Sequence, residues 1–171
     1  MYTDHYGLTA APFQLTPDAR FWFESATHKK AMAYLGYGLQ QAEGFIVVTG
    51  EIGAGKTTLL ATLAGLRSLE HGDGEVCLNG AALAELSKAA IAKQIAFLPA
   101  HNHLPFPLSV RELLLLAEPA PDAYGAALEA MELQALEDQP VTRLSTGEVK
   151  RAWIAMTLSR RTPLMLLDEP L

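Results

Sequence analysis

The sequence predicts an α/β protein with a largely parallel sheet, and three observations lead to that fold class. The chain has 171 residues, which suits one domain with a continuous core. Half of the residues are hydrophobic and 19% are charged, so the composition is that of a globular protein. Apolar runs of strand type alternate with segments of helical periodicity in the order β-α-β-α-β, which is typical of parallel sheets covered by helices.

The first half of the chain supplies this alternation. An arm rich in aromatic and turn-forming residues is followed by a helix, which Thr27 caps and Gly44 ends. Residues 45–49 form an apolar, β-rich run between glycines, typical of a strand buried on both faces of a sheet. Further elements are predicted as a helix over 56–66, a strand over 75–79 closed by Asn79 and Gly80, a helix over 84–93 and a strand over 94–98.

The second half begins with a helical insert of about residues 104–140. Ser109 and Glu112 form a capping-box pattern at the head of a leucine-rich helix, and a second helix is expected over residues 122–135. Another capping box, at residues 145–148, starts a helix that continues to about Arg160. The apolar run 164–168 is predicted to be a final buried strand.

Charge and terminal composition exclude several function classes. Thirteen Lys and Arg against 19 Asp and Glu give a net charge of −6, which argues against broad binding to nucleic acid. The single cysteine, Cys77, is interpreted as a small apolar strand residue and is compatible with a reducing compartment. The sequence contains neither a secretory signal pattern nor an uninterrupted apolar run of membrane-spanning length. We therefore expect a cytoplasmic protein whose membrane role, if it has one, is peripheral.

The strongest chemical motif is a glycine-rich loop between a predicted strand and a predicted helix. It matches G-x-x-x-x-G-K-[ST], the P-loop or Walker A pattern, and indicates an NTPase fold. Glycines allow backbone N–H groups and the helix N-terminus to face a phosphate chain, while Lys56 reaches the β- and γ-phosphates and the Thr57 hydroxyl binds Mg²⁺. The expected nucleotide-binding residues are Gly50, Glu51, Ile52, Gly53, Ala54, Gly55, Lys56, Thr57 and Thr58.

A second motif is the acidic pair at the end of the last predicted strand. Asp168 at the tip of a strand beside a P-loop can position Mg²⁺ through water, and Glu169 can orient the attacking water. Such a pair often merely ends a strand, but the P-loop makes a Walker B interpretation the favoured one. Lys56 and Glu169 are therefore the candidate catalytic residues, and Thr57 and Asp168 the candidate metal ligands.

A third motif lies at the start of the helix over residues 145–160. It admits two interpretations: a capped amphipathic helix, or a helix N-terminus that receives a phosphate through its N–H groups. The motif consists of Leu144, Ser145, Thr146, Gly147 and Glu148.

From about residue 59 to residue 171 the sequence resembles the nucleotide-binding domain of ATP-binding cassette (ABC) transporters, and its insert is most similar to importers of metal chelates. The resemblance implies a subunit that binds and hydrolyses ATP with Mg²⁺. It also implies that two copies dimerise when ATP binds, so that the signature motif at 144–148 of one copy caps the γ-phosphate held by the other. Such subunits work with membrane permease subunits. The resembling segments, besides the P-loop, are 63–66, 74–80, 95–99, 109–113, 144–148 and 166–170.

Residues 1–58 resemble a different family, the ExeA-type AAA ATPases of secretion systems. The resemblance rests on Tyr6-Gly7-Leu8, Pro12-Phe13, residues 15–18, Arg20-Phe21 and residues 44–51. We therefore interpret the chain as a mosaic, natural or constructed, within a single P-loop domain that stops short of the ABC family's C-terminal elements. Its parts are an aromatic arm and helix (1–43), a P-loop core (44–103), a helical insert (104–143), and a signature helix with the Walker B strand (144–171).

The departures from the ABC pattern bear on turnover. Ala100 stands where the family has a glutamine that contacts Mg²⁺, and Thr146 replaces the first glycine of the signature. His101 or Asn102 could substitute for the glutamine, but exposed loop polar residues are the favoured interpretation. Tyr34 or Tyr37 could stack on adenine, yet core packing is favoured for both.

Three functions stay open. The first is an ATP-hydrolysing subunit of an ABC-type transporter. The second is a nucleotide-binding module with little or no turnover, which Ala100 and the missing D-loop and switch histidine favour, and the third is an ExeA-type AAA ATPase linked to secretion.

Overall fold

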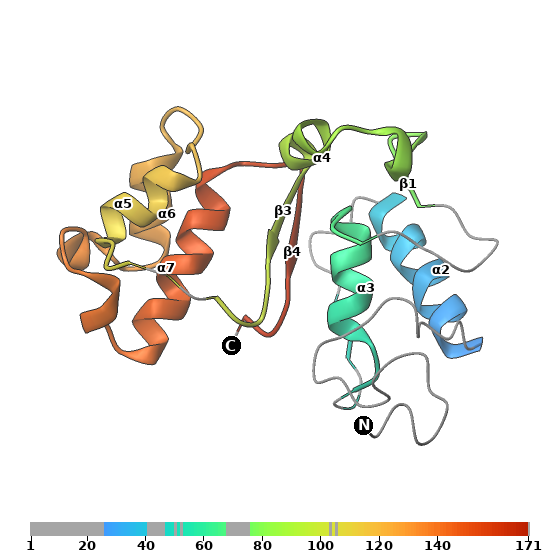
Figure 1. Cartoon of the computed structure of the whole chain (residues 1–171), viewed down its shortest axis with the longest axis horizontal. Coiled ribbons are helices and arrows are strands. Elements are labelled where there is room, and N and C mark those ends of the chain that lie inside the picture. Colours follow the sequence, from blue (N-terminus) through green and yellow to red (C-terminus); the bar gives the residue numbers. More distant parts are fainter. Residues whose placement is uncertain are drawn as a thin grey trace, which may run out of the picture.

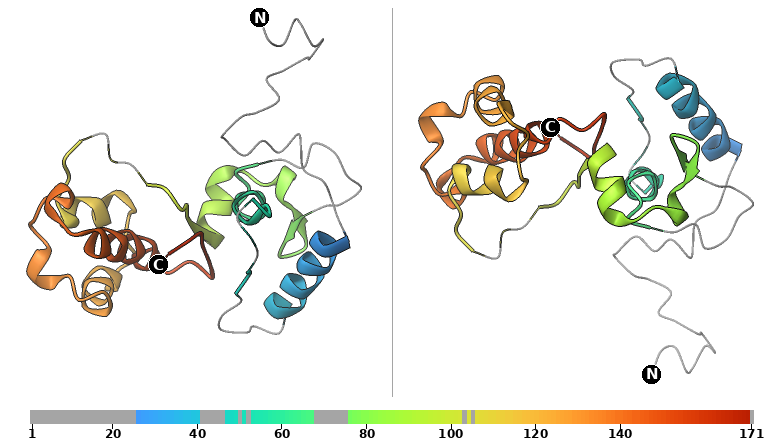
Figure 2. Two further views of the ribbon diagram at one scale, coloured as in Figure 1. Left: turned by 90° about the horizontal axis from the view of Figure 1, so that it is seen from below. Right: turned by 90° about the horizontal axis from the view of Figure 1, so that it is seen from above.

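The computed structural model of the chain describes residues 26–40, 47–49, 51, 53–67, 76–102, 104 and 106–170. Figure 1 shows two groups of helices separated by a pair of strands, and the views in Figure 2 show the same division. The helices and strands, in chain order, are α2 (Ala26–Gln40), α3 (Lys56–Leu63), β1 (Cys77–Leu78), β2 (Ala81–Ala82), α4 (Lys88–Gln94), β3 (Ile95–Leu98), α5 (Val110–Leu116), α6 (Ala123–Ala130), α7 (Thr146–Ser159) and β4 (Leu164–Leu167).

The central pair, β3 and β4, consists of two predicted strands that lie far apart in the sequence, and they pair in parallel, in agreement with the predicted largely parallel sheet. Ile95 is opposite Leu164 and Leu98 is opposite Leu167. The ladder continues for one more hydrogen bond, from the backbone N–H of Asp168 to the carbonyl of Leu98 at 2.9 Å. This bond places Asp168 directly at the carboxyl end of the pair.

The α3 side of the strand pair has a small apolar core. Ala64, Ile91, Ile95 and Leu166 are all buried there, so the end of α3 and α4 both pack against the strands. Gly65 ends the α3 segment with φ +69, and a Cβ at this position would lie 2.8 Å from the Ile91 side chain. Glycine is needed here both for the left-handed backbone and for the close approach.

The second group of helices, α5, α6 and α7, has the larger core. Its fully buried side chains include Val110, Leu113, Leu114 and Leu133, which pack with alanines of α7. The helices α5 and α6 lie in the predicted insert, and their starts follow the sequence closely. The second insert helix is shorter than predicted: it ends at Ala130, and the chain reverses through Glu132 (φ 54) before a 3₁₀ turn over Gln134–Leu136.

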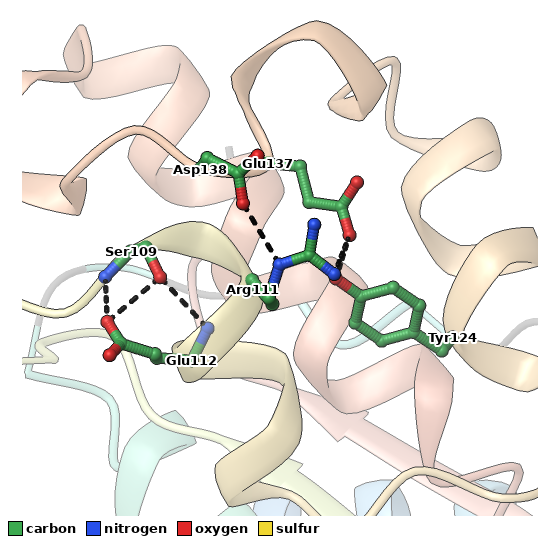
Figure 3. A network of polar contacts seen from close by, with 6 residues as sticks. All are labelled: Ser109, Arg111, Glu112, Tyr124, Glu137 and Asp138. Carbon is green, nitrogen blue, oxygen red and sulfur yellow. Dashed lines mark hydrogen bonds and ion pairs between the residues drawn. The ribbon is translucent and has the colours of Figure 1, made fainter.

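A polar network ties α5 to the connection between α6 and α7 (Figure 3). The Arg111 guanidinium donates to Asp138 Oδ1 and pairs with Glu137 Oε1, each at 2.9 Å. The Tyr124 hydroxyl donates to the same oxygen of Glu137. Burial of the phenol, and secondarily this hydrogen bond, raise the pKa of Tyr124 to about 12.

The two capping boxes predicted from sequence are confirmed. The Ser109 Oγ accepts from the N–H of Glu112 at 3.2 Å, and a Glu112 oxygen accepts from the N–H of Ser109 at 2.8 Å (Figure 3). Ser145 and Glu148 make the same reciprocal bonds at the start of α7. These bonds from Ser109 and Ser145 lower the pKa of Glu112 and of Glu148, because each stabilises the ionised carboxylate.

The strand predicted over residues 45–49 is not found in the part of this segment that the structure describes. Residues 47–49 are irregular, and Val47 is 82% exposed rather than buried. Phe45 and Ile46 lie outside the described residues. A β-rich composition becomes a strand only when a neighbouring strand pairs with it, and among the described residues nothing pairs with 47–49.

The segment after residue 75 also differs from the prediction. Asn79 and Gly80 form the expected turn, with φ of 53° and 83°, but the turn joins β1 to β2 as an antiparallel hairpin and leads to no helix directly. The helix predicted from residue 84 begins instead at Lys88, after a 3₁₀ turn over Leu83–Glu85. The later start has a local cause, because the Ser87 hydroxyl caps the Ala90 N–H at 3.2 Å.

A helix follows the arm as predicted, but α2 already includes Thr27, which therefore does not cap it, and the predicted end at Gly44 lies outside the described residues. The predicted burial of its tyrosines is also wrong. Tyr34 and Tyr37 are 65% and 61% exposed, so the expectation that they pack in the core is wrong. Leu35 is buried at 6% exposure, so this helix turns at least one apolar side chain away from solvent. The Lys30 ammonium lies over the Tyr34 ring, 5.8 Å from its centre.

In the described part of the chain, none of the helices is long and apolar enough to cross a membrane.

Candidate nucleotide-binding site

The P-loop residues that the structure describes form a tight turn that enters α3. Gly53 and Gly55 both have left-handed backbones, with φ of 84° and 85°, which glycine adopts without strain. The Ala54 N–H donates to the Glu51 carbonyl at 3.1 Å and closes the turn. Gly50 and Ile52 lie outside the described residues. The helix starts at Lys56, as the motif predicts.

The first turn of α3 presents the groups that phosphate binding requires. The first backbone hydrogen bond of the helix runs from Leu59 to the Gly55 carbonyl at 2.9 Å, and the N–H groups before Leu59 therefore point out of the helix end. The positive end of the helix dipole adds to their attraction for an anion. Thr57 is half-buried in this turn, and Thr58 is buried behind it.

The Lys56 side chain folds back over the loop. Its ammonium donates to the Glu51 carbonyl at 3.0 Å, the same oxygen that receives the Ala54 N–H. The lysine therefore lies against the concave side of the turn. A bound phosphate would compete with that carbonyl for one of the three donors of the ammonium.

The acidic pair lies at the carboxyl end of β4. Asp168 is only 3% exposed, and its Oδ2 atom is buried with no hydrogen-bond partner among the described residues. An unpartnered buried carboxylate oxygen is costly, and a cation is the partner that suits it. Glu169 is exposed and has a left-handed backbone with φ of 49°, which separates its side chain from the strand.

The fold brings the P-loop and the acidic pair to one side of the molecule. In Figure 1 the amino end of α3 and the carboxyl ends of β3 and β4 all lie at the lower side. A hard cation bound by Asp168 would take oxygen ligands, and the Thr57 hydroxyl belongs to the same end of the fold. The orphaned Asp168 oxygen therefore fits a magnesium ion, and the left-handed glycines at a helix start fit a phosphate chain.

The signature residues lie elsewhere. Helix α7, which they begin, is on the opposite side of the strand pair from α3 in the views of Figures 1 and 2. Thr146 and Gly147 are exposed, and Ser145 and Glu148 are occupied with each other in the capping box. The structure therefore does not bring the signature to the P-loop of its own chain, and it shows the capping box that the first of the two interpretations requires.

The loop after β3 contains a residue whose role the sequence did not reveal. Asn102 is half-buried, and its side-chain amide donates to the Pro99 carbonyl at 2.9 Å, so the expectation of an exposed loop residue is wrong for it. His101 is exposed as expected, and Ala100 offers no side-chain ligand. The pattern of Pro followed by Asn three positions later is the available signal, because both residues favour turns.

Comparison with known proteins decides the family. A family model described as "ABC transporter" matches residues 38–171 of the chain. The chain belongs to the ABC transporter family. Among curated relatives, the probable siderophore transport system ATP-binding protein YusV of Bacillus subtilis (strain 168) is 38% identical over 136 residues, which is 72% of this chain and 49% of the relative. The ferric enterobactin transport ATP-binding protein FepC of Escherichia coli (strain K12) is 34% identical over 74% of this chain and 50% of its own length.

The chain spans about half the length of these curated relatives. A solved structure, a putative ABC transporter ATP-binding protein from Pyrococcus furiosus, aligns with a TM-score of 0.58 at 30% identity, covering 71% of this chain and 60% of that one. This alignment confirms the α/β fold class of a P-loop ABC ATPase. The other resemblance is confirmed as a shorter match: general secretion pathway protein A of Aeromonas hydrophila is 46% identical over 59 residues, 34% of this chain and 11% of that protein.

Proposed function

We propose that the chain binds ATP with Mg²⁺ and hydrolyses it as the ATP-binding subunit of an ABC-type transporter. One observation carries the proposal: the buried Asp168 Oδ2 atom has no hydrogen-bond partner among the described residues and lies at the same side of the fold as a glycine-rich turn that enters a helix. Family membership over residues 38–171 supports the same conclusion.

In this proposal the P-loop residues hold the phosphates. The backbone N–H groups of Gly53, Gly55 and Lys56 cradle the phosphate chain, and the Lys56 ammonium leaves the Glu51 carbonyl to bind the β- and γ-phosphates. Thr57 and Asp168 hold Mg²⁺, which supplies charge neutralisation for the phosphates when it is bound. The remaining P-loop residues, Gly50, Glu51, Ile52, Ala54 and Thr58, contribute the shape of the loop.

Hydrolysis is in-line attack of water on the γ-phosphate. Glu169 orients that water and accepts its proton, a new P–O bond forms, and the bond to the β-phosphate oxygen breaks to release ADP. Because phosphoryl transfer depends almost entirely on positioning and charge stabilisation, Lys56 and Glu169 are the residues whose removal matters most.

The test is nucleotide binding and phosphate release by the purified chain. At an ATP concentration about 100 times Kd with Mg²⁺, binding adds about 2.7 kcal/mol to the free energy of unfolding, and Tm rises by about 5–10 °C. Lys56→Ala is expected to lower phosphate release by about 10²-fold or more. Lys88→Ala is its matched control, because Lys88 is the first residue of another helix and is exposed.

Glu169→Gln tests the water-orienting role. It is expected to abolish phosphate release while leaving the Tm shift with ATP intact, because an amide keeps the size of the carboxylate but not its basicity. Glu132→Gln is the control, since Glu132 is also exposed and also has a left-handed backbone, with φ of 54° against 49° for Glu169. Phosphate release that neither Lys56→Ala nor Glu169→Gln changes would exclude hydrolysis at this site.

A nucleotide-binding module with little turnover is the second candidate, and Ala100 is the observation that favours it. This residue supplies no ligand at the end of β3, where the ABC pattern has glutamine. A Tm shift with ATP but no phosphate release from the wild-type chain supports the module. The ExeA-type AAA ATPase is a weaker alternative, supported by the 59-residue match to a secretion pathway protein.

The partners follow from the same proposal. ATP-dependent homodimerisation is expected to place the signature of one chain against the γ-phosphate of the other, because α7 lies away from the P-loop of its own chain. We propose that the membrane partners are permease subunits of a metal-chelate importer, because the relatives belong to siderophore transport systems. The chain would then lie at the cytoplasmic face of the inner membrane. Sedimentation of Glu169→Gln with saturating ATP tests the dimer, and a persistent monomer would contradict it.

A further inference from the structure

We infer that Asn102 is a positioning residue of the proposed magnesium and nucleotide site. Its side-chain amide stabilises the turn after β3, and this turn stabilises the end of β3, whose backbone holds Asp168 in place. The inference rests on the proposed function, and it assigns a role in that site to a residue outside its motifs.

The hydrogen bond from the Asn102 side chain to Pro99 closes the turn in place of a backbone hydrogen bond. The Asn102 amide nitrogen donates to the Pro99 carbonyl at 2.9 Å, three positions back along the chain. A β-turn is ordinarily closed by a backbone N–H over the same spacing, and an asparagine side chain can hydrogen-bond to a backbone group three residues earlier. Asn102 is half-buried, so water competes only partly for its amide.

The turn is connected directly to the acidic end of the site. Pro99 follows Leu98, and the Leu98 carbonyl accepts the backbone N–H of Asp168 at 2.9 Å. This bond is the last one between the two parallel strands, since Leu98 is opposite Leu167 at the end of the ladder. A turn that loosens after Pro99 therefore loosens the bond that places Asp168.

The position of the Asp168 carboxylate depends strongly on the position of its backbone. Its Oδ2 atom has no hydrogen-bond partner in the described part of the chain, so no donor there orients that oxygen toward a cation. The backbone N–H of Asp168 donates to the Leu98 carbonyl, and this bond fixes the backbone from which the carboxylate projects. Groups that orient a metal ligand from behind typically change metal affinity by about 10- to 100-fold when they are removed.

The neighbours of Asn102 in the turn do not duplicate its contact. Ala100 has no side-chain donor, and His101 is exposed. His101→Ala is therefore the matched control: it changes a polar side chain of the same turn next to Asn102 without removing the amide.

The experiment is a Mg²⁺ titration of the full chain at a fixed ATP concentration, followed by Tm and by the fluorescence of a labelled ATP analogue. Asn102→Ala is expected to raise the Mg²⁺ concentration for half-maximal effect by about tenfold. Asn102→Asp keeps the size but loses the donor and should behave like Asn102→Ala, whereas Asn102→Gln keeps an amide donor and should recover part of the affinity. His101→Ala should match the wild-type chain.

The possible results distinguish failure of the proposed function from failure of the inference about Asn102. A wild-type chain with no Mg²⁺-dependent response to ATP overturns the proposed function and this inference with it. A normal wild-type response with the same Mg²⁺ midpoint in Asn102→Ala and His101→Ala overturns the inference alone. A lower Tm of nucleotide-free Asn102→Ala with an unchanged Mg²⁺ midpoint also overturns it, because the role of Asn102 is then structural only.

Discussion

Replacing Asp168 with asparagine should stabilise the chain when no ligand is bound. Asp168 is 3% exposed and has a buried carboxylate oxygen that no described residue satisfies. Leaving a buried polar group unsatisfied costs about 1–3 kcal/mol, and more when the group is charged. Asparagine has nearly the same volume, so Asp168→Asn removes the charge without opening a cavity.

The asparagine amide is still a buried polar group without a partner, so the expected gain is only the difference between a charged and a neutral unsatisfied group, about 1 kcal/mol in the free energy of unfolding. In a chain of this length that corresponds to a rise in Tm of about 2–4 °C. Urea unfolding and thermal melts in EDTA measure the gain. With ATP and Mg²⁺ the wild-type chain should be more stable than Asp168→Asn, because only the wild-type carboxylate binds the cation. Ligand at 100 times Kd adds about 2.7 kcal/mol to the free energy of unfolding of the wild-type chain.

Glu169→Gln is the control for this comparison. The two residues are adjacent, but Glu169 is exposed, and its substitution should change the free energy of unfolding by less than about 0.5 kcal/mol. If Asp168→Asn is no more stable than the wild-type chain in EDTA, the buried oxygen is not an uncompensated charge. The reasoning that connects Asp168 to a cation is then refuted.

Two further predictions concern the scaffold. Gly65→Ala should destabilise the chain by about 1–3 kcal/mol, because Gly65 has a backbone φ of +69 and a Cβ there would lie 2.8 Å from the Ile91 side chain. Gly125→Ala should instead stabilise it by about 0.5–1 kcal/mol, because Gly125 lies within α6 and the space around its Cβ position is open. Urea unfolding measures both effects, and equal effects would contradict the packing argument. The raised pKa of Tyr124, about 12, means that the folded state holds its proton more tightly than the unfolded state; this contribution is fully present below about pH 10 and is lost as the pH rises toward 12. Tyr124→Phe should remove that part of the alkaline loss of stability, and identical pH profiles for the two chains between pH 9 and 12 would exclude it.

The helix starts were predictable because their causes are local. Ser109 and Ser145 each meet a glutamate three positions later, and the reciprocal bonds form within one turn regardless of what packs around them. The helix predicted from residue 84 begins instead at Lys88 for an equally local reason, because the Ser87 side chain caps its first turn.

The strands and the burial of helix faces were less predictable because they depend on partners. Residues 45–49 have the composition of a buried strand, yet Val47 is exposed because pairing, rather than composition, makes a strand. Tyr34 and Tyr37 have spacing that suits a buried helical face. Which face of α2 packs inward is decided by the neighbouring elements, and Leu35 is the residue they bury.

The sequence by itself determined the family, the P-loop and the acidic pair, because a phosphate-binding turn needs glycines, a lysine and a helix start in a fixed order along the chain. Only the tertiary structure decided what surrounds those residues. At the end of the β3–β4 pair the Asp168 Oδ2 atom is buried with no hydrogen-bond partner among the described residues, and the Asn102 amide bonds Pro99, the residue that follows β3. Burial and hydrogen bonding across distant segments are properties of the packed chain, and no spacing rule along the sequence encodes them.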